Sequence, residues 1–493
     1  MAEPYDLDLE SMQEARRLAV ACREAQRAFF NFSQEQVDRI CAAMAEAAFR
    51  EAERLARMAV EETGYGNVAH KTVKNQFASR GVWESIRSIP TVGIIRRDEE
   101  KEIIEIGWPV GVIAALTPST NPTSTAMYKI LISVKARNGI VLAPHPAAVR
   151  CSLETTRVMA EAGEAQGMPK GLVSCMTKIS LPGTQELMRH YAVSLILATG
   201  GAAMVKAAHS VGKPAYGVGP GNVPCYVDRS ADIPKAARDI VNSKAFDHSV
   251  LCSTEQAVVA DKPIAAQLAS EMERNGAFFV DKAQADALAK VLFLSDGAIN
   301  PHSVGKTPQQ LAQMAGIQVP SRARILVARL DGVGAAYPLS REKLTTVLGW
   351  YEEEGWRAGC ERCIEILKFG GDGHTLVIHA RNEEVILAFG LEKPAFRIVV
   401  NTMATLGSVG ATTGLMPSLT LATGGIGGSV TSDNITVPHV LNVKRLAYEL
   451  KPPPLGAIAP AVEAGSPASA APTIMSDQDL EAIVRRVLSQ IGR

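Results

Sequence analysis

Short apolar runs alternate with longer amphipathic stretches between residues 110 and 198, and this alternation constrains the fold more than any other feature of the chain. Apolar runs lie at 110–116, 139–143, 172–177 and 194–198, and helical patterns separate them at 122–136, 149–165 and 182–190. Buried apolar strands joined by helices predict a parallel, doubly wound sheet in an α/β fold. Ligands of such sheets bind beyond the carboxyl ends of the strands, so we expect a ligand site at that edge.

The rest of the chain adds a helical start and a second α/β region. Residues 8–63 carry apolar side chains at helical spacing. The highly charged run 96–106 predicts a projecting strand or hairpin, either as a solvated edge or as an oligomer contact. Further strands are predicted at 256–259, 325–328, 375–379 and 397–400. At 493 residues the chain is expected to form two or three domains.

The composition changes at the end of the chain. Residues 452–475 are rich in Pro, Ala, Gly and Ser, which is typical of a flexible linker. Between 476 and 493 apolar residues recur on one face of a short amphipathic helix. An isolated helix of this length is marginal in water. It therefore either packs back on its own domain or binds a groove on a separate partner, and the linker favours the partner.

Several classes of function are disfavoured by composition. Lys and Arg total 51, as do Asp and Glu, a balance that argues against nucleic acid or an anionic membrane as partner. The most apolar stretch, 103–116, is interrupted by Glu105 and Pro109, so no membrane span is expected. The acidic start lacks a signal peptide pattern, and eight cysteines in a chain this long fit a reducing cytosol. Nine histidines without metal-ligand spacing and a lone C-x-x-C at 360–363 predict no metal site.

Cys252 is the residue whose sequence context most clearly suggests a chemical role. It stands between an apolar lead-in and a polar run. Most cysteines are simply small buried hydrophobes, but a thiolate can also attack a carbonyl carbon. Glycine-dense turns at 199–205 and 217–224 could admit a phosphate to backbone N–H groups, although each also fits an ordinary turn. Asn121 could donate to an oxyanion or merely form a turn. With Glu342, these features suggest hydride transfer from a thiol-bound substrate.

Taken together, these segments resemble the CoA-acylating aldehyde dehydrogenases of the aldehyde dehydrogenase superfamily over nearly all of 10–450. The matching pieces are 117–123, 145–146, 196–201, 217–224, 246–256, 342–344, 373–375, 378–379, 397–401, 414–420 and 432–434. The resemblance implies a Rossmann-type cofactor domain, an α/β catalytic domain and a small oligomerisation element. The corresponding ranges are 1–228 for NAD and CoA binding, with 96–106 as the oligomerisation hairpin, 229–430 for catalysis, and 431–451 as a returning oligomerisation segment.

The resemblance also implies roles for individual residues. Cys252 is the expected nucleophile, Asn121 and the Cys252 backbone N–H would form the oxyanion hole, and His374 matches a position close to the active site. Glu342 falls where the family binds the nicotinamide ribose, and His145 lies near the adenosine end. The full set expected to bind cofactor is Thr117, Pro118, Ser119, His145, Pro146, Thr199, Gly200, Gly201, Val205, Gly219, Glu342 and Leu344.

One departure from the superfamily bears on the final acceptor. Hydrolytic members carry a glutamate in an E-L-G-G turn that activates water, whereas the equivalent turn here, 218–222, has no carboxylate. A CoA thiol, partly ionised near neutral pH, is then the better acceptor. We therefore expect aldehyde, NAD⁺ and CoA to give acyl-CoA and NADH, reversibly. The alternatives are a hydrolytic or phosphorylating aldehyde dehydrogenase, or a scaffold without catalytic activity.

The C-terminal linker and helix resemble the encapsulation tails of bacterial microcompartment enzymes. That likeness implies a cytoplasmic protein held within a microcompartment, with the helix at 476–493 bound to a shell or cargo protein. It also favours a short volatile substrate such as acetaldehyde or propionaldehyde. A homodimer or homotetramer is expected from the family.

Overall fold

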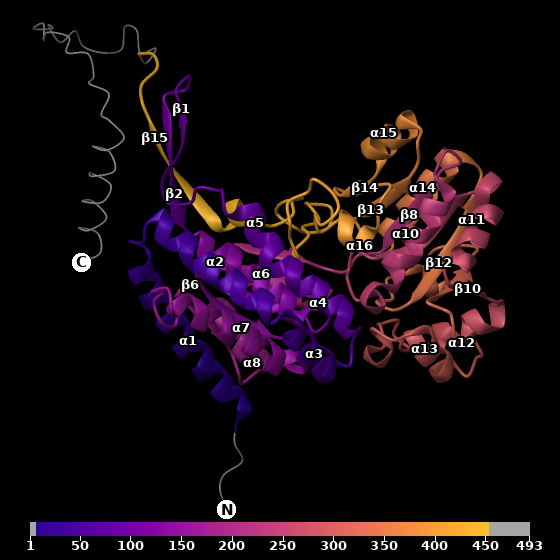
Figure 1. Cartoon of the computed structure of the whole chain (residues 1–493), viewed down its shortest axis with the longest axis horizontal. Helices are drawn as coiled ribbons and strands as arrows, with labels where there is room; N and C mark the ends of the chain where they lie inside the picture. The colour runs from indigo at the N-terminus through magenta and orange to yellow at the C-terminus, as the bar shows by residue number, and fades with distance from the viewer. Residues whose placement is uncertain (1–5, 453–493) are drawn as a thin grey trace, which may run out of the picture.

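The structure, a computed structural model, describes residues 6–452 and contains three sheets (Figure 1). Their strand orders are β5-β4-β3-β6-β7, β10-β11-β12-β9-β8-β13-β14 and β1-β2-β15. The expected helix at 476–493 and all but the first residue of the expected linker lie outside the described residues. None of the helices between residues 6 and 452 is both long and apolar enough to cross a membrane.

The five-stranded sheet confirms the parallel, doubly wound arrangement predicted from the alternating pattern. Its strands are β3 (Val112–Thr117), β4 (Gly139–Pro144), β5 (Val173–Cys175), β6 (Val193–Thr199) and β7 (Ala215–Val218), all parallel. Helices α1 (Leu7–Phe29), α2 (Gln34–Arg50), α6 (Pro122–Lys135), α7 (Val149–Glu164), α8 (Leu181–Arg189) and α9 (Ala202–His209) surround it. The strand order reverses between β3 and β6, which is where such sheets bind ligands.

Both faces of this sheet are buried, which explains why its strands are apolar without interruption. Ile113 and Ala115 of β3 pack in the cluster that includes α2 and α6. Val112, Ala114 and Leu116, which alternate with them, pack in the opposite cluster with α1 and α8. Successive side chains of a strand point to opposite faces, so a strand covered on both sides needs apolar residues at every position.

The seven-stranded sheet is also entirely parallel. It contains β8 (Val223–Val227), β9 (Glu255–Asp261), β10 (Ala277–Val280), β11 (Ile325–Arg329), β12 (Val347–Glu353), β13 (Leu376–His379) and β14 (Ile398–Val400). Helices α10 (Ile233–Ala245) and α11 (Lys262–Arg274) pack on one face, and α14 (Gly355–Lys368) and α15 (Glu383–Glu392) pack on the other. Helices α12 (Lys282–Leu292) and α13 (Pro308–Ala315) form a further apolar cluster beside β11.

The expected boundary at 228/229 falls just after a strand that belongs to the seven-stranded sheet. Strand β8 lies before that boundary, yet it pairs with β9 and β13 of the seven-stranded sheet. The chain passes from one sheet to the other in the short turn between Val218 and Val223. The end of β7 and the start of β8 both lie within the glycine-rich run 217–224. They could not be recognised from the sequence, because a tight crossing between sheets and an ordinary turn have the same local composition. Strands β7, β10 and β12 also escaped prediction.

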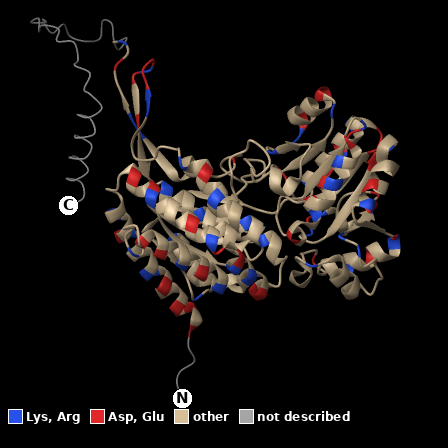
Figure 2. Cartoon of the chain, in the orientation of Figure 1, with Lys and Arg blue, Asp and Glu red and all other residues tan. Residues whose placement is uncertain are grey.

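The charged run forms the predicted hairpin. Strands β1 (Gly93–Asp98) and β2 (Ile103–Pro109) pair antiparallel, and β15 (Leu441–Ala447), which returns from the far end of the described chain, pairs with β2. Together they project from the body as an arm (Figure 1). Charged residues occur along the arm (Figure 2), and Arg445 pairs with Glu105 across its strands.

Short helices complete the region between the sheets. They are α3 (Ala52–Thr63), α4 (Val68–Gln76), α5 (Val82–Ile86) and α16 (Ala404–Gly407). Helices α1, α2 and α3 confirm the helical reading of residues 8–63. Helix α4 begins at Asn67, whose side chain accepts from the His70 N–H and caps the helix. The capped helix holds two lysines beside the site described next.

Candidate active site

A cavity of about 430 Å³ lies where loops from the two parallel sheets meet. The five-stranded sheet contributes the segments that follow β3 and β6 and the turn after β7. The approach to β9 contributes Val250, Leu251, Cys252 and Ser253. The position at carboxyl strand ends matches the sequence-based expectation for a doubly wound sheet.

Most of the residues expected in the site line this cavity. They are Pro118, Ser119, Asn121, His145, Thr199, Gly200, Gly201, Gly219, Cys252, Glu342 and Leu344. Residues as far apart in sequence as Pro118 and Leu344 therefore contribute to one surface.

Four of the expected residues do not line the cavity. Thr117 is the buried last residue of β3, and Pro146 is exposed in a short turn after β4. Val205 lies in α9 and packs against Gly217, where an added Cβ would come within 2.5 Å of its side chain. His374 is fully buried behind Gly221, and burial lowers its pKa to about 3. Thr117, Pro146 and Val205 each directly adjoin a lining residue in sequence, whereas the residues next to His374 do not line the cavity.

Cys252 differs from the other cysteines by its exposure. All eight cysteines lie in the described part of the chain, and Cys252 alone among them is partly exposed. Burial raises the pKa of its thiol to about 12; the Glu342 carboxylate adds to this rise, and Arg397 opposes it. The resting side chain is therefore a thiol at neutral pH, and it needs a proton acceptor before it can attack.

The glycine turn after β7 lies against the nucleophile segment. A Cβ added to Gly221 would lie 2.3 Å from the Cys252 carbonyl oxygen, so the close approach requires glycine. The Gly221 N–H donates to Glu342 Oε1 at 2.9 Å. Burial raises the pKa of Glu342 to about 7, with Gly221 and nearby lysines opposing the rise. Glu342 is the carboxylate among the lining residues, all of which belong to the described range.

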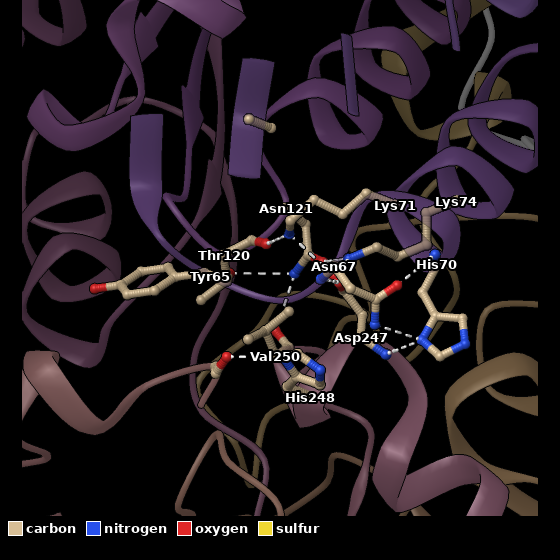
Figure 3. A network of polar contacts seen from close by, with 12 residues as sticks. Tyr65, Asn67, His70, Lys71, Lys74, Thr120, Asn121, Asp247, His248 and Val250 are labelled. Atoms are coloured by element: carbon tan, nitrogen blue, oxygen red, sulfur yellow. Dashed lines mark hydrogen bonds and ion pairs between the residues drawn. The ribbon is translucent and has the colours of Figure 1, made fainter. Parts of the chain in front are cut away.

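Asn121 and the Cys252 segment are joined to a buried charge network (Figure 3). Asn121 Nδ2 donates to the Val250 carbonyl at 3.1 Å, and its Oδ1 accepts from Lys74. Lys74 and Lys71 both pair with the carboxylate of Asp247. Burial alone would raise the pKa of Asp247, but the two lysines hold it below its ordinary value. Burial lowers the pKa of Lys74 to about 7 although Asp247 opposes this.

This network was missed from the sequence. The available clues were two lysines three residues apart in 68–76 and an aspartate five residues before Cys252. Lys74 and Asp247 are separated by 173 positions, and no local pattern pairs them.

The remaining wall of the cavity is mostly apolar. Its less polar residues are Tyr65, Met204, Val218, Pro220, Val250, Leu251, Ile299, Pro301, Val304, Val409, Leu419 and Leu421, and Thr120, Thr125 and Ser253 add hydroxyl groups. No Lys or Arg is among the lining residues in 6–452. An ionised group on a ligand would therefore have no lysine or arginine on this surface to pair with.

The backbone around α9 fits the phosphates of a dinucleotide. Gly200 and Gly201 line the cavity at the start of this helix, where backbone N–H groups are free of intrahelical partners. A Cβ added to Gly201 or to Gly219 would meet no described atom within 4 Å. Open space beside these glycines leaves room for a bound group to approach the backbone.

Comparison with known proteins agrees with this fold. The model of the aldehyde dehydrogenase family matches residues 5–277, more than half of the chain. Succinate-semialdehyde dehydrogenase (acetylating) of Clostridium kluyveri is 35% identical, and the match covers 88% of this chain and 95% of that protein. Aldehyde-alcohol dehydrogenase 2 of Entamoeba histolytica is 40% identical over 84% of this chain and 49% of that protein. The chain thus spans about half the length of aldehyde-alcohol dehydrogenases it matches.

Solved structures show the same architecture over most of the chain. An acetylating aldehyde dehydrogenase from Geobacillus thermoglucosidasius has a TM-score of 0.90 and 49% identity, covering 91% of this chain and 99% of that one. A propionaldehyde dehydrogenase from Rhodopseudomonas palustris with bound propionyl-CoA has a TM-score of 0.80 and 29% identity, covering 88% and 94%. A propionaldehyde dehydrogenase from a fucose utilisation microcompartment of Clostridium phytofermentans has a TM-score of 0.80 and 29% identity, covering 87% and 96%.

The chain belongs to the aldehyde dehydrogenase family. Its fold is the aldehyde dehydrogenase fold, with the parallel five-stranded sheet in the Rossmann-like position.

Proposed function

We propose that the protein oxidises a short, uncharged aldehyde to its acyl-CoA with NAD⁺ and CoA, reversibly, through a thioester on Cys252. The observation that carries this proposal is the turn between Val218 and Asn222. It packs against the Cys252 carbonyl through Gly221, and none of its own residues carries a carboxylate. A water-activating base is therefore missing from the position that hydrolytic members of the superfamily use, and a thiol is the better acceptor.

The chain's own groups act in sequence on the aldehyde. The Cys252 thiolate attacks the carbonyl carbon, and the oxygen becomes an oxyanion in a tetrahedral hemithioacetal. Asn121 Nδ2 and the Cys252 backbone N–H stabilise that oxyanion; one such donor is worth about 2.7–4 kcal/mol. NAD⁺, when bound, supplies the acceptor for the hydride that leaves the hemithioacetal carbon. The CoA thiolate then attacks the resulting thioester, Cys252 leaves as thiolate, and acyl-CoA is released.

The cavity surface suggests where NAD⁺ binds. Gly200 and Gly201 at the start of α9 suit the pyrophosphate, and Glu342 suits the ribose next to the nicotinamide. His145 lines the cavity, in keeping with its proposed place near the adenosine end. The choice of NAD⁺ over NADP⁺ follows the family likeness.

The apolar wall restricts the substrate. The C. kluyveri relative is named for succinate semialdehyde, whose carboxylate needs a charged or hydrogen-bonding partner. Leu251, Val304 and Leu421 offer none, so the wall favours the alkyl chain of acetaldehyde or propionaldehyde. The propionyl-CoA bound to the R. palustris neighbour supports the same substrate class.

The experiment is a panel of C2 to C4 aldehydes and succinate semialdehyde, followed by NADH absorbance and product mass spectrometry. Acetaldehyde or propionaldehyde should give acyl-CoA only when CoA is present, and succinate semialdehyde should turn over at least tenfold less efficiently. Free acid formed equally fast without CoA would support the hydrolytic alternative. Acyl phosphate formed with phosphate in place of CoA would support the phosphorylating alternative.

We further propose that the segment after residue 452 binds a microcompartment shell or cargo protein, and that the arm of β1, β2 and β15 makes a homodimer or homotetramer. The microcompartment origin of the C. phytofermentans neighbour supports the first proposal. Deleting residues 453–493 should leave turnover intact and abolish co-sedimentation with purified shell proteins. NADH formation that survives Cys252→Ala would contradict the catalytic role proposed for Cys252, and a wild-type protein that forms no NADH from any aldehyde would favour the scaffold alternative.

A further inference from the structure

Two lysines of α4 are buried beside the nucleophile segment. Lys71 and Lys74 lie one helical turn apart, and both side chains are almost fully buried. Each pairs with Asp247, whose side chain is 0% exposed, and the Lys71 Nζ to Asp247 Oδ2 distance is 3.0 Å. Burying three charges is costly unless each is paired, so a network of this kind is more than a way to stabilise the fold.

The two lysines differ in their second contact. Lys71 Nζ donates to the backbone carbonyl of Thr120 at 2.9 Å. Lys74 Nζ donates to the side-chain Oδ1 of Asn121 (Figure 3). One lysine thus holds the main chain, and the other holds the amide expected to face the aldehyde oxygen.

The Lys74 contact fixes which way the Asn121 amide points. An asparagine amide has an accepting and a donating end of nearly equal size, and its hydrogen-bond partners decide the orientation. A lysine ammonium can only donate, so it selects Oδ1. Nδ2 is then turned toward the Val250 carbonyl at 3.1 Å and the Thr120 hydroxyl at 3.1 Å. Val250 lies two residues before Cys252, which places the donating end on the nucleophile side.

Asp247 links this orientation to the nucleophile segment itself. Its Oδ1 accepts the Asn67 N–H at 2.9 Å, and its own N–H donates to His70 at 2.8 Å. Asp247, His248 and Ser249 all have left-handed backbones, with φ of 48°, 50° and 66°. Non-glycine residues adopt this conformation only where surrounding contacts enforce it. The same carboxylate therefore anchors Lys74 and the strained approach to Cys252.

We propose that Lys74 is a positioning residue that keeps the donating end of the Asn121 amide on the cavity side, where the aldehyde oxygen replaces the Thr120 hydroxyl as acceptor of one N–H, with Asp247 holding Lys74 in place. This inference rests on the proposed function, because it assigns Asn121 to the oxyanion. Without Lys74 the amide can turn over, and its carbonyl would then face the developing negative charge.

The test is a mutant cycle on the first half-reaction, measured as the NADH burst from propionaldehyde and NAD⁺ without CoA. Asn121→Ala should slow the burst about 10²–10³-fold, as expected for loss of one oxyanion donor. Lys74→Met should slow it at least 30-fold, and the double variant should be no more than threefold slower than Asn121→Ala alone. Such non-additivity is the mark of residues that act through each other.

Lys71→Met is the matched control, because Lys71 is equally buried and pairs with the same carboxylate but does not contact the Asn121 amide. Whatever its effect on the burst rate, that effect should multiply with the effect of Asn121→Ala in the double variant. A second readout is alkylation of Cys252 by iodoacetamide, which forms no oxyanion. The alkylation rate should stay within threefold of wild type in Lys74→Met. Lys74→Gln replaces Lys74→Met in the same cycle if the latter does not fold.

Three results would overturn the proposal: a wild-type burst rate in the Lys74 variant, effects of Lys74 and Asn121 that multiply, or alkylation slowed as much as the burst. Because the burst needs no CoA, the outcome is separate from that of the proposed function. If the mutant cycle shows the expected non-additivity but turnover does not depend on CoA, the Lys74 assignment stands and acyl transfer to CoA is rejected.

Discussion

The two sides of the cavity are built in different ways. The side that follows β6 and β7 is made of backbone and glycine, with Gly200, Gly201 and Gly219 on its surface. The side near Cys252 is supported by buried charges, among them Lys71, Lys74 and Asp247. The first kind of surface depends on local chain geometry, whereas the second depends on contacts between residues more than 170 positions apart. Substitutions should therefore affect binding on the first side, and stability and chemistry on the second.

The largest effect is expected from Asp247→Ala. Removing this carboxylate leaves two buried ammonium groups without their partner, and breaking a buried ion pair in this way costs about 3–5 kcal/mol. Urea unfolding should show a loss of that size. Asp247→Asn, which retains an acceptor for the Asn67 N–H, should lose less. Equal stability of wild type and Asp247→Ala would mean that the charged side is no more constrained than the glycine side.

Gly221→Ala should reduce turnover about 100-fold. The added Cβ would lie 2.3 Å from the Cys252 carbonyl oxygen, so the nucleophile segment has to move, and a displacement of about 1 Å can cost that much in rate. Steady-state kcat checks this. Gly370→Ala is the control, since a Cβ there meets no described atom within 4 Å. Comparable kcat values for the two variants would contradict the close packing described for Gly221.

Glu342→Gln should stabilise the protein at alkaline pH. Burial raises the pKa of Glu342 to about 7 from an ordinary value of 4.5, so the folded state binds a proton more tightly than the unfolded state. The resulting penalty is fully present above pH 7 and disappears as the pH falls to 4.5; at about 1.4 kcal/mol per pH unit it reaches about 3 kcal/mol. Thermal unfolding should show a gain at pH 8 that vanishes near pH 4.5. A gain that is the same at both values would assign the effect to packing.

The smallest effect is expected on the glycine side. Gly201→Val adds a side chain to a space that is free of described protein atoms, so the melting temperature should stay within about 2 °C. The same side chain would occupy room proposed for the pyrophosphate, and the KM for NAD⁺ should rise about tenfold or more. Titration of NAD⁺ at saturating aldehyde measures this. An unchanged KM would remove Gly201 from the proposed cofactor surface.

Continuous apolar runs that stand between clear helical patterns were the easiest elements to predict. Strands β3, β4 and β6 are continuous apolar runs between helices, and the segment around Cys252 carries a distinctive sequence. Strand β8 was not predicted, because Gly219 and Gly221 beside it read as an ordinary turn. Strand β15 was not predicted, because its partner β2 lies more than 300 positions away and its outer residues are polar.

The residues of the candidate site likewise differ in whether a local sequence pattern reveals them. Cys252 and the glycines at strand ends that line the cavity with it were singled out from the sequence because each stands in a local pattern. Lys74 and Asp247 were not, because an isolated lysine in a polar helix is normally on the surface. His374 was placed in the right neighbourhood, but its side chain is behind Gly221 and not on the cavity surface.

The most direct test of the account is to trap the acyl group. The protein is incubated with propionaldehyde and NAD⁺ without CoA, digested at low pH, and its peptides are examined by mass spectrometry before and after CoA is added. The account predicts a propionyl mass on the Cys252 peptide that disappears on addition of CoA as propionyl-CoA forms. A propionyl group on another side chain, or its loss as propionate at the same rate without CoA, would contradict it.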